Sequence, residues 1–244
     1  MRNALFVVAT SLFVLGSVGC GSTDVTVPSF QKGQGQAPQT GEAYPAGPYG
    51  INVGSVVENY HFVGYVNYVA DHTDGMQEVQ LADFYNPHAD DPNYDPGDGP
   101  DDRVFPDGSP YGAGTPKPKA LLIDVSSVWC PPCNDEAHYS LPGKYSAYKP
   151  QGGEFLLNLA DGPNPGTSAT PDDLTTWTNE YHEEFPAVID PEYKLAALFA
   201  ADFFPANMVV NPRNMKICKV VSGAPDQSTW NLYGDVLVGK ETCD

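Results

Sequence analysis

The chain has 244 residues, of which 41% are hydrophobic, and a formal net charge of −19 at pH 7. This hydrophobic fraction is sufficient for a folded core, which excludes a wholly disordered chain. The strong negative charge, without a basic cluster, excludes nucleic acid and anionic membrane surfaces as partners. We therefore expect a single monomeric domain with a tail.

Residues 1–19 have the pattern of a secretory signal peptide. Arg2 precedes an apolar run over residues 4–18, which is shorter than the about 20 residues needed to span a bilayer. Cys20 follows Gly19, and this junction resembles the lipobox of bacterial lipoproteins, in which the cysteine is lipidated after cleavage. The resemblance implies an exported protein, held only by lipid on Cys20 at the periplasmic face of the outer membrane or at the cell surface. The alternative is an ordinary signal peptide that leaves Cys20 as a free thiol.

Residues 20–49 are rich in Gly, Pro and Gln and lack aliphatic periodicity. This composition predicts a flexible linker between the lipidated cysteine and a domain over residues 50–244. The domain begins with residues favoured in strands, so we expect a strand over 55–69, a return strand over 78–81 and a helical turn over 81–85.

Residues 86–118 form an insertion dominated by Asp, Pro and Gly. Three of its side chains alternate as in a calcium-binding loop: Asp91, Asn93 and Asp95. Pro96 stands where such a loop needs Gly, and Asp102 stands where it needs Glu. The insertion is therefore either a solvated acidic loop or a calcium loop. The histidines of this half of the chain share no spacing, so we expect no metal site from them (His61, His72 and His88).

The remainder of the chain alternates between apolar strands and amphipathic helices, which predicts an α/β fold with a central mixed β-sheet flanked by helices. Pro142 and Gly143 should kink or split the helix after Cys133. The expected strands are 120–125, 153–160, 187–190, 206–211 and 215–222, and the expected helices are 134–148, 170–185, 191–200 and 223–237.

Residues 129–133 read Trp-Cys-Pro-Pro-Cys at the junction between a strand and a helix. Unpaired N–H groups at a helix start favour negative charge on Cys130, which makes it the expected nucleophile, with Cys133 one turn later as the resolving thiol. Asp124 lies on the strand that leads into the site. Burial should raise its pKa, which suits it to shuttle the proton of Cys133.

These residues together resemble the thioredoxin superfamily, and in particular its exported TlpA/ResA-like branch. The resemblance consists of the Trp129–Cys133 motif, Asp124 before it, Glu136 three residues after it, and Phe204-Pro205 at the position of the family's cis-proline. It implies a thioredoxin-like fold, here with an N-terminal strand extension and with the acidic insertion over residues 86–118, which is not a usual part of the family.

The resemblance also implies a function, which is thiol-disulfide exchange with the thiols and disulfides of partner proteins, without cofactor or metal. Glu136 is then expected to support the site. Substrate contacts are expected from Trp129, Pro131, Phe204 and Pro205. The alternative is a catalytically idle surface lipoprotein that serves as a binding module, linked to calcium through the acidic loop. A peroxidase that uses Ser127 with an arginine, and half a zinc site, are weaker alternatives.

In an exported protein the remaining cysteines tend to pair. Without Cys20 there are four, which allow three pairings. The short loop between Cys130 and Cys133 favours their pairing, which leaves Cys218 with Cys243 as a structural disulfide.

Overall fold

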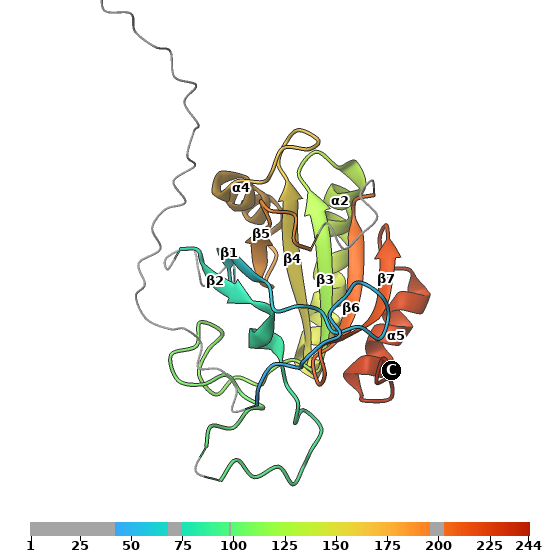
Figure 1. Ribbon diagram of the computed structural model, residues 1–244. Helices are drawn as coiled ribbons and strands as arrows, with labels where there is room; N and C mark the ends of the chain where they lie inside the picture. Colours follow the sequence, from blue (N-terminus) through green and yellow to red (C-terminus); the bar gives the residue numbers. More distant parts are fainter. Residues whose placement is uncertain (1–41, 68–74, 98, 196–202) are drawn as a thin grey trace, which may run out of the picture. The chain divides into compact units, whose positions relative to one another are not determined.

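The computed structural model describes residues 42–67, 75–97, 99–195 and 203–244 (Figure 1). The predicted signal peptide, Cys20 and most of the predicted linker lie outside the described residues. No helix within the described part of the chain is long and apolar enough to cross a membrane.

The described strands form one mixed sheet in the order β2-β1-β5-β4-β3-β6-β7 (Figure 1). The three central strands β5, β4 and β3 are parallel, and all other neighbours are antiparallel. The predicted α/β class with a mixed sheet is confirmed. The strands are β1 (His61–Tyr65), β2 (Gln77–Gln80), β3 (Ala120–Ser127), β4 (Gly153–Asp161), β5 (Ala187–Ile189), β6 (Ala206–Asn211) and β7 (Lys216–Ser222).

Helices connect the parallel strands and close the chain. The helix predicted after Cys133 is split, as expected: a π-helical turn separates its two α-helical parts. Pro142 explains the break, because it lacks the N–H that would bond one turn back. The helical elements are η1 (Leu81–Phe84), α2 (Pro131–Asp135), η2 (Glu136–Ser140), α3 (Leu141–Tyr148), η3 (Lys149–Gln151), α4 (Pro171–Tyr181) and α5 (Gln227–Leu237).

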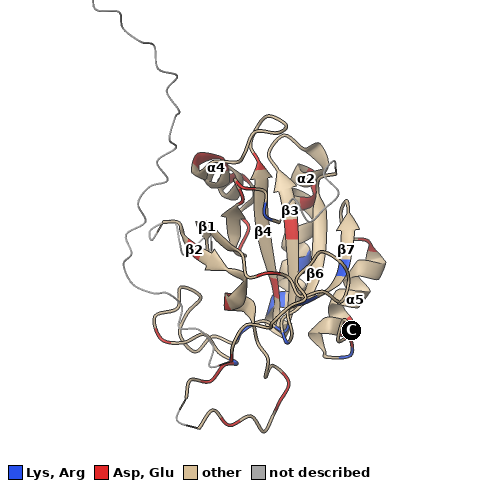
Figure 2. Ribbon diagram, in the orientation of Figure 1, with Lys and Arg blue, Asp and Glu red and all other residues tan. Residues whose placement is uncertain are grey.

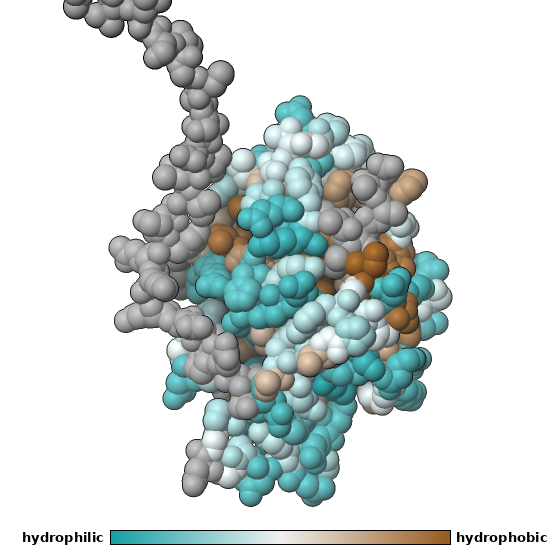
Figure 3. Space-filling view, in the orientation of Figure 1, coloured by the Kyte–Doolittle hydropathy of each residue, from teal (hydrophilic) through white to brown (hydrophobic). Residues whose placement is uncertain are grey.

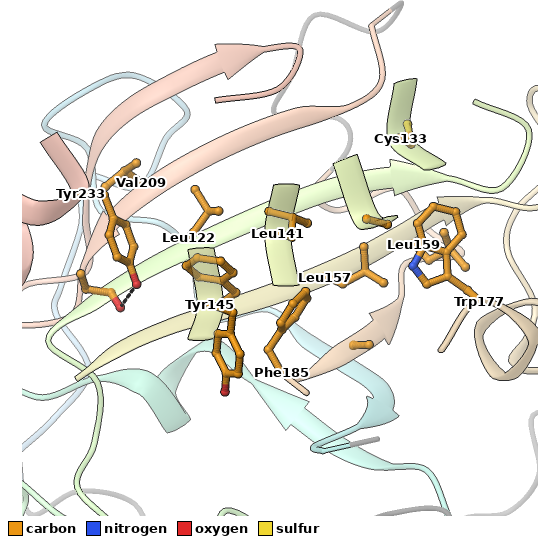
Figure 4. Close-up of a cluster of buried hydrophobic side chains, with 14 of the residues drawn as sticks. Leu122, Cys133, Leu141, Tyr145, Leu157, Leu159, Trp177, Phe185, Val209 and Tyr233 are labelled. Carbon is orange, nitrogen blue, oxygen red and sulfur yellow. Dashed lines mark hydrogen bonds between the residues drawn. The ribbon is translucent and has the colours of Figure 1, made fainter. Parts of the chain in front are cut away.

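Each face of the sheet has its own apolar cluster, because successive strand residues point to opposite faces. On one face, Leu122 and Leu157 pack against residues of α3, α4 and α5 (Figure 4). On the other face, Leu121 and Ile123 pack against η1 and against the segment around Val57. Every residue of β3 and β4 is buried, which fits strands covered on both faces.

The predicted helix over residues 191–200 is wrong for residues 191–195, which form turns; residues 196–202 lie outside the described part of the chain. Two causes act at this point. The carboxyl of Asp190 accepts 2.8 Å hydrogen bonds from the backbone N–H groups of Lys194 and Leu195. Tyr193 has a left-handed backbone, with φ at 56°, which a helix cannot contain.

The predicted strand over residues 55–69 is also shorter than expected. Within its described residues, 55–67, only His61–Tyr65 pairs as a strand, although Val56 forms isolated bridges with Tyr49 and Lys216. Ordered contacts begin before residue 50, since the hydroxyl of Tyr44 donates a 2.7 Å hydrogen bond to the carbonyl of Val57. In this segment, high strand propensity is therefore a better guide to packing against the domain than to pairing in the sheet.

The insertion over residues 86–118 consists, apart from residue 98, which is not described, of turns and one isolated bridge between Val104 and Pro116. Two of the proposed calcium ligands are engaged in local turns: Asp91 accepts from the N–H of Asn93, and Asp95 from that of Gly97. No group of three His, Cys, Asp or Glu residues that could hold a metal is found in the described ranges.

The surface agrees with the composition. The side seen in Figure 3 is mainly hydrophilic, with apolar residues gathered beside β7. Figure 2 shows acidic residues distributed over the domain. The one acidic residue of β3, Asp124, is buried rather than solvated.

Candidate active site

Cys130 and Cys133 form a disulfide at the start of α2, with Cα atoms 5.3 Å apart. Cys130 is the N-cap residue, and its Sγ accepts a 3.3 Å hydrogen bond from the backbone N–H of Cys133. Pro131 is the first helical residue, where its missing N–H leaves no helical bond unmade. Pro131 and Pro132 have no N–H, so in this first turn it is the N–H of Cys133 that favours negative charge on the sulfur of Cys130 once the disulfide opens.

Both cysteines are buried in this oxidised state: Cys130 is 1% exposed and Cys133 is fully buried. The two residues belong to the apolar cluster that includes Leu159 and Trp177, and Figure 4 shows Cys133 at one end of it. A partner's thiolate can reach the sulfur of Cys130 only after neighbouring side chains move apart.

Asp124 lies in β3, six residues before Cys130, and is 2% exposed. The strand register places it between Leu157 of β4 and Asn207 of β6, on the helix-covered face of the sheet. Its Oδ2 accepts a 2.8 Å hydrogen bond from the hydroxyl of Ser126. Burial raises the pKa of Asp124 to about 7, and the Ser126 hydrogen bond opposes this rise. The carboxyl can therefore take up or release a proton near neutral pH.

Glu136, at the start of η2, is a second buried carboxyl, 3% exposed. The side-chain amide of Asn207 donates hydrogen bonds of 3.2 Å to Oε1 of Glu136 and of 3.2 Å to the carbonyl of Gly223. Burial and the charge of Asp124 raise the pKa of Glu136 to about 9, and the Asn207 hydrogen bond opposes them. Because Asn207 is also the cross-strand neighbour of Asp124, the three side chains form one polar layer.

Trp129 is held by Asp161, a residue that the sequence did not single out. The indole Nε1–H donates a 2.9 Å hydrogen bond to Oδ2 of Asp161, which also accepts one of 2.8 Å from the N–H of Gly166. Oδ1 of Asp161 accepts a 2.6 Å hydrogen bond from the hydroxyl of Tyr193. Asp161 is the last residue of β4, so it lies at the same sheet end as the residues that follow β3. The position of Asp161 at the end of the predicted strand next to β3 is the signal by which the sequence could have identified it.

Phe204 and Pro205 join the site from far along the chain. Their peptide bond is cis, as the resemblance implies. Ala206, the next residue, pairs with Val125 of β3, which puts Pro205 at the sheet end that carries the disulfide. The Phe204 ring lies edge-on to Trp129, with ring centroids 6.0 Å apart. With the cysteines at the start of the helix after the central strand, this completes the expected arrangement.

The chain has a thioredoxin-like fold. No family model matches it, and no curated protein does. Solved structures similar to it include a candidate thiol:disulfide interchange protein DsbE from Chlorobium tepidum, at 15% identity over 78% of this chain and 99% of that one, with a TM-score of 0.49. The thioredoxin domain of the thiol-disulfide oxidoreductase BVU-2223 from Bacteroides vulgatus has 17% identity over 76% and 98%, with a TM-score of 0.47. The exposed lipoprotein thioredoxin Etrx1 from Streptococcus pneumoniae has 15% identity over 72% and 96%, with a TM-score of 0.44.

The placement of the arginines does not support the peroxidase alternative. That chemistry needs an arginine beside Ser127 and the reactive cysteine. Of the arginines in the described residues, Arg103 is paired with Asp101 within the insertion, and Arg213 with Asp90 of the same insertion. Both are thus engaged away from the disulfide.

The second disulfide joins Cys218 of β7 to Cys243, with Cα atoms 4.6 Å apart. Both cysteines are buried, at 8% and 3% exposed. They join the segment after α5 to the edge strand of the sheet. This disulfide therefore closes the C-terminal end of the domain, separate from the Cys130–Cys133 disulfide at the start of α2.

Proposed function

We propose that the protein is a thiol-disulfide oxidoreductase that exchanges the Cys130–Cys133 disulfide with thiols and disulfides of partner proteins. The observation that carries the proposal is the disulfide at the start of α2 with the carboxyl of Asp124 buried on the same face of the sheet. Thiol exchange needs an attackable sulfur, a resolving thiol and a group that moves the resolving thiol's proton. These residues supply all three.

The exchange can be written in the direction that oxidises a partner dithiol. A partner thiolate attacks the sulfur of Cys130, the Cys130–Cys133 bond breaks, and the Cys133 thiolate takes a proton from Asp124. The partner's second thiolate then attacks the partner's first sulfur, which is bonded to Cys130 in the mixed disulfide. The partner's own disulfide forms, and the Cys130 thiolate is released. The partner loses two electrons and the protein gains them. In the reverse direction the Cys133 thiol returns its proton to Asp124 and attacks the mixed disulfide.

The aromatic and proline residues at the same sheet end are proposed to contact the partner. Trp129 is fixed by Asp161 and flanked by Phe204, and Pro131 is exposed beside the disulfide. Pro205 lies at the start of β6, beside the end of β3. Glu136 is proposed to support the site through Asn207.

An insulin-reduction assay with dithiothreitol tests this proposal. Wild type should accelerate insulin precipitation, and Cys130→Ser should lower the rate to that of dithiothreitol alone. Cys218→Ala/Cys243→Ala, which removes the other disulfide, should keep activity at a temperature where it is folded. Equal rates for wild type and Cys130→Ser would end the proposal.

Burial of both active-site cysteines favours a second candidate, in which the disulfide is a structural element of a binding module. A structural disulfide resists reduction, whereas an exchanging one reacts readily. Reduction of the folded protein by dithiothreitol separates the two candidates. If the Cys130–Cys133 bond persists at millimolar dithiothreitol while the fold is intact, the binding module is correct.

We also propose that the protein is exported and anchored through lipid on Cys20. The support is the pattern of residues 1–20 and the presence of two disulfides, which form and persist in oxidising compartments. Metabolic labelling with a radioactive fatty acid should label the wild type and not Cys20→Ser. Absence of label on the wild type would leave an ordinary signal peptide.

A further inference from the structure

The two most exposed large hydrophobic side chains of the described residues belong to segments of the redox site. Tyr139, in η2, is 77% exposed, and Phe203, directly before the residues of the cis peptide bond, is 65% exposed. The exchange steps described above give Tyr139 no role. Large aromatic side chains that are exposed on the segments of a reactive site indicate a surface that binds another protein.

Tyr139 lies on one exposed face of the helical segment that begins at the disulfide. The buried residues of this segment include Cys133, Glu136 and Ala137. The exposed residues recur at helical spacing, which places them together on the opposite side of the segment. We call this surface the Tyr139 face, and it consists of Pro131, Pro132, Asp135, His138 and Tyr139. Because Pro131 directly follows Cys130, the face begins at the disulfide and continues along the helix.

The aromatic end of the Tyr139 face is held in place by α4. The ring of His138 lies edge-on to the ring of Tyr139, with centroids 4.3 Å apart, and to that of Tyr181 in α4, at 6.3 Å. Tyr181 in turn lies edge-on to the buried Trp177, at 4.6 Å. An aromatic surface that is fixed before binding loses little conformational freedom when a partner's side chain packs on it.

The charges around the Tyr139 face favour a positively charged partner. None of α2, η2 and α4 contains Lys or Arg. The two lysines that follow η2 in the chain are engaged elsewhere: Lys144 lies over an aromatic ring of α5, and Lys149 is paired with Glu154. Asp135, exposed and four residues before Tyr139, forms no ion pair with another described residue. An exposed aromatic ring and an unpaired carboxylate on one helix face both attract a cation.

We propose that the Tyr139 face is the docking surface for a positively charged segment of the partner protein, in which Lys or Arg lies near the reacting cysteine. The inference rests on the proposed function and names the class of partner for the redox site. Position 137, midway between Asp135 and Tyr139, is seven residues after Cys130. That separation is about 10 Å along a helix, which an extended partner chain spans in about three residues. The cation therefore lies about three residues from the partner's cysteine.

Peptide binding tests this inference without exchange chemistry. The probes are two nine-residue peptides with a central serine in place of the cysteine. One carries arginine three residues to either side of the serine, and the other carries glutamate there. Each peptide is titrated into the ¹⁵N-labelled oxidised protein at pH 8 and low salt, and NMR gives the Kd. The arginine peptide should bind at least about five-fold more tightly, and the amide signals that shift should include those of Asp135 and Tyr139.

Two variants of the face and one control locate the binding site. Tyr139→Ala removes the ring and Asp135→Asn removes the charge, and each should weaken binding of the arginine peptide by roughly three-fold. Both side chains are exposed, so the fold should be retained. Asp107→Asn removes the same charge from an exposed residue of the insertion, which lies at the opposite end of the domain from α2 (Figure 1). This control should leave the Kd unchanged.

Equal Kd values for the two peptides would overturn the inference. Equal weakening in Asp107→Asn and Asp135→Asn would also overturn it, because the peptide would then respond to the net charge of the protein and not to the Tyr139 face. The peptides contain no cysteine, so the measurement needs no exchange activity. It therefore fails or succeeds independently of the insulin assay, which alone decides the proposed function.

Discussion

The indole N–H of Trp129 donates a 2.9 Å hydrogen bond to Oδ2 of Asp161, which ties the residue before the redox disulfide to the end of the neighbouring strand. The same carboxyl accepts from Gly166 and Tyr193, so one side chain holds three segments. It thereby fixes the aromatic surface beside Cys130.

Asp161→Ala should therefore impair both stability and exchange. Loss of a buried acceptor leaves donors unpaired, and we expect the free energy of unfolding to fall by at least about 2 kcal/mol. The KM for a protein substrate should rise, since Trp129 is no longer held. Urea unfolding and insulin reduction measure the two effects. Asp172→Ala, an exposed acid on α4, should change neither; an unaffected Asp161→Ala would show that Trp129 is held by packing alone.

The raised pKa of Asp124 makes stability depend on pH. In the unfolded chain the carboxyl ionises near 3.8, and in the folded protein burial moves its pKa to about 7. Folding thus retains a proton that the unfolded chain loses, so stability is highest below pH 4, falls as the pH rises toward 7, and then levels.

Asp124→Asn removes this loss, because asparagine does not ionise. Each unit of pKa shift corresponds to about 1.4 kcal/mol, so the variant should be more stable than wild type at pH 8 by a few kcal/mol, with the difference shrinking toward pH 4. Urea unfolding of the oxidised proteins at both values measures it. The variant should also exchange more slowly near neutral pH. Equal stabilities at pH 8 would mean that the carboxyl is not buried as an acid.

The two cysteines of the redox site should differ when each is replaced. Cys133→Ser retains the attacking thiol and loses the resolving one, so mixed disulfides with partner proteins should accumulate. Cys130→Ser should form few or none. Each variant is incubated with a substrate protein that contains a disulfide, and non-reducing electrophoresis then measures the amount of mixed disulfide. More adduct on Cys130→Ser would reverse the assigned roles.

The Cys218–Cys243 disulfide is expected to contribute stability and not chemistry. It links residues 25 positions apart, and closing a loop of that length contributes about 3 kcal/mol through the unfolded chain. Cys218→Ala/Cys243→Ala should lower the free energy of unfolding by about this amount. A loss of exchange activity in the folded variant would contradict the separation of the two disulfides.

Arg213 is expected to hold the insertion against the domain. Its Nε donates a 2.5 Å hydrogen bond to Asp90, and its Nη1 donates to the carbonyls of Lys119 and Val236. Arg213→Ala should accelerate protease cleavage within residues 86–118 and destabilise the fold by about 2 kcal/mol. Arg103→Ala is the matched control, because its partner Asp101 lies within the insertion itself. Equal cleavage rates in the two variants would refute the anchoring role.

The strands and the redox motif could be predicted because their signals are local. Residues 120–127 are an unbroken run of buried positions, and such a run appears in the sequence as apolar residues without alternation. Asp124 stood out against that run. The cysteines, the two prolines between them and the split at Pro142 each depend on immediate neighbours in the chain.

What the sequence did not reveal depends on register and on distant partners. Asp161 and Asn207 are ordinary polar residues along the chain, and they join the site only because β4 and β6 lie beside β3. The turn at residues 191–195 was missed because a left-handed Tyr193 has no local signal.

The side-chain amide of Asn207 bonds at once to Glu136 on the cysteine-bearing helix segment and to the carbonyl of Gly223 at the turn before α5. This one amide group connects a buried acid to a partly exposed loop. Any gain or loss of a proton on Glu136 therefore alters a bond that ends near the surface. An isotope or fluorescent label at that turn would act as a reporter of the redox site, leaving every cysteine untouched.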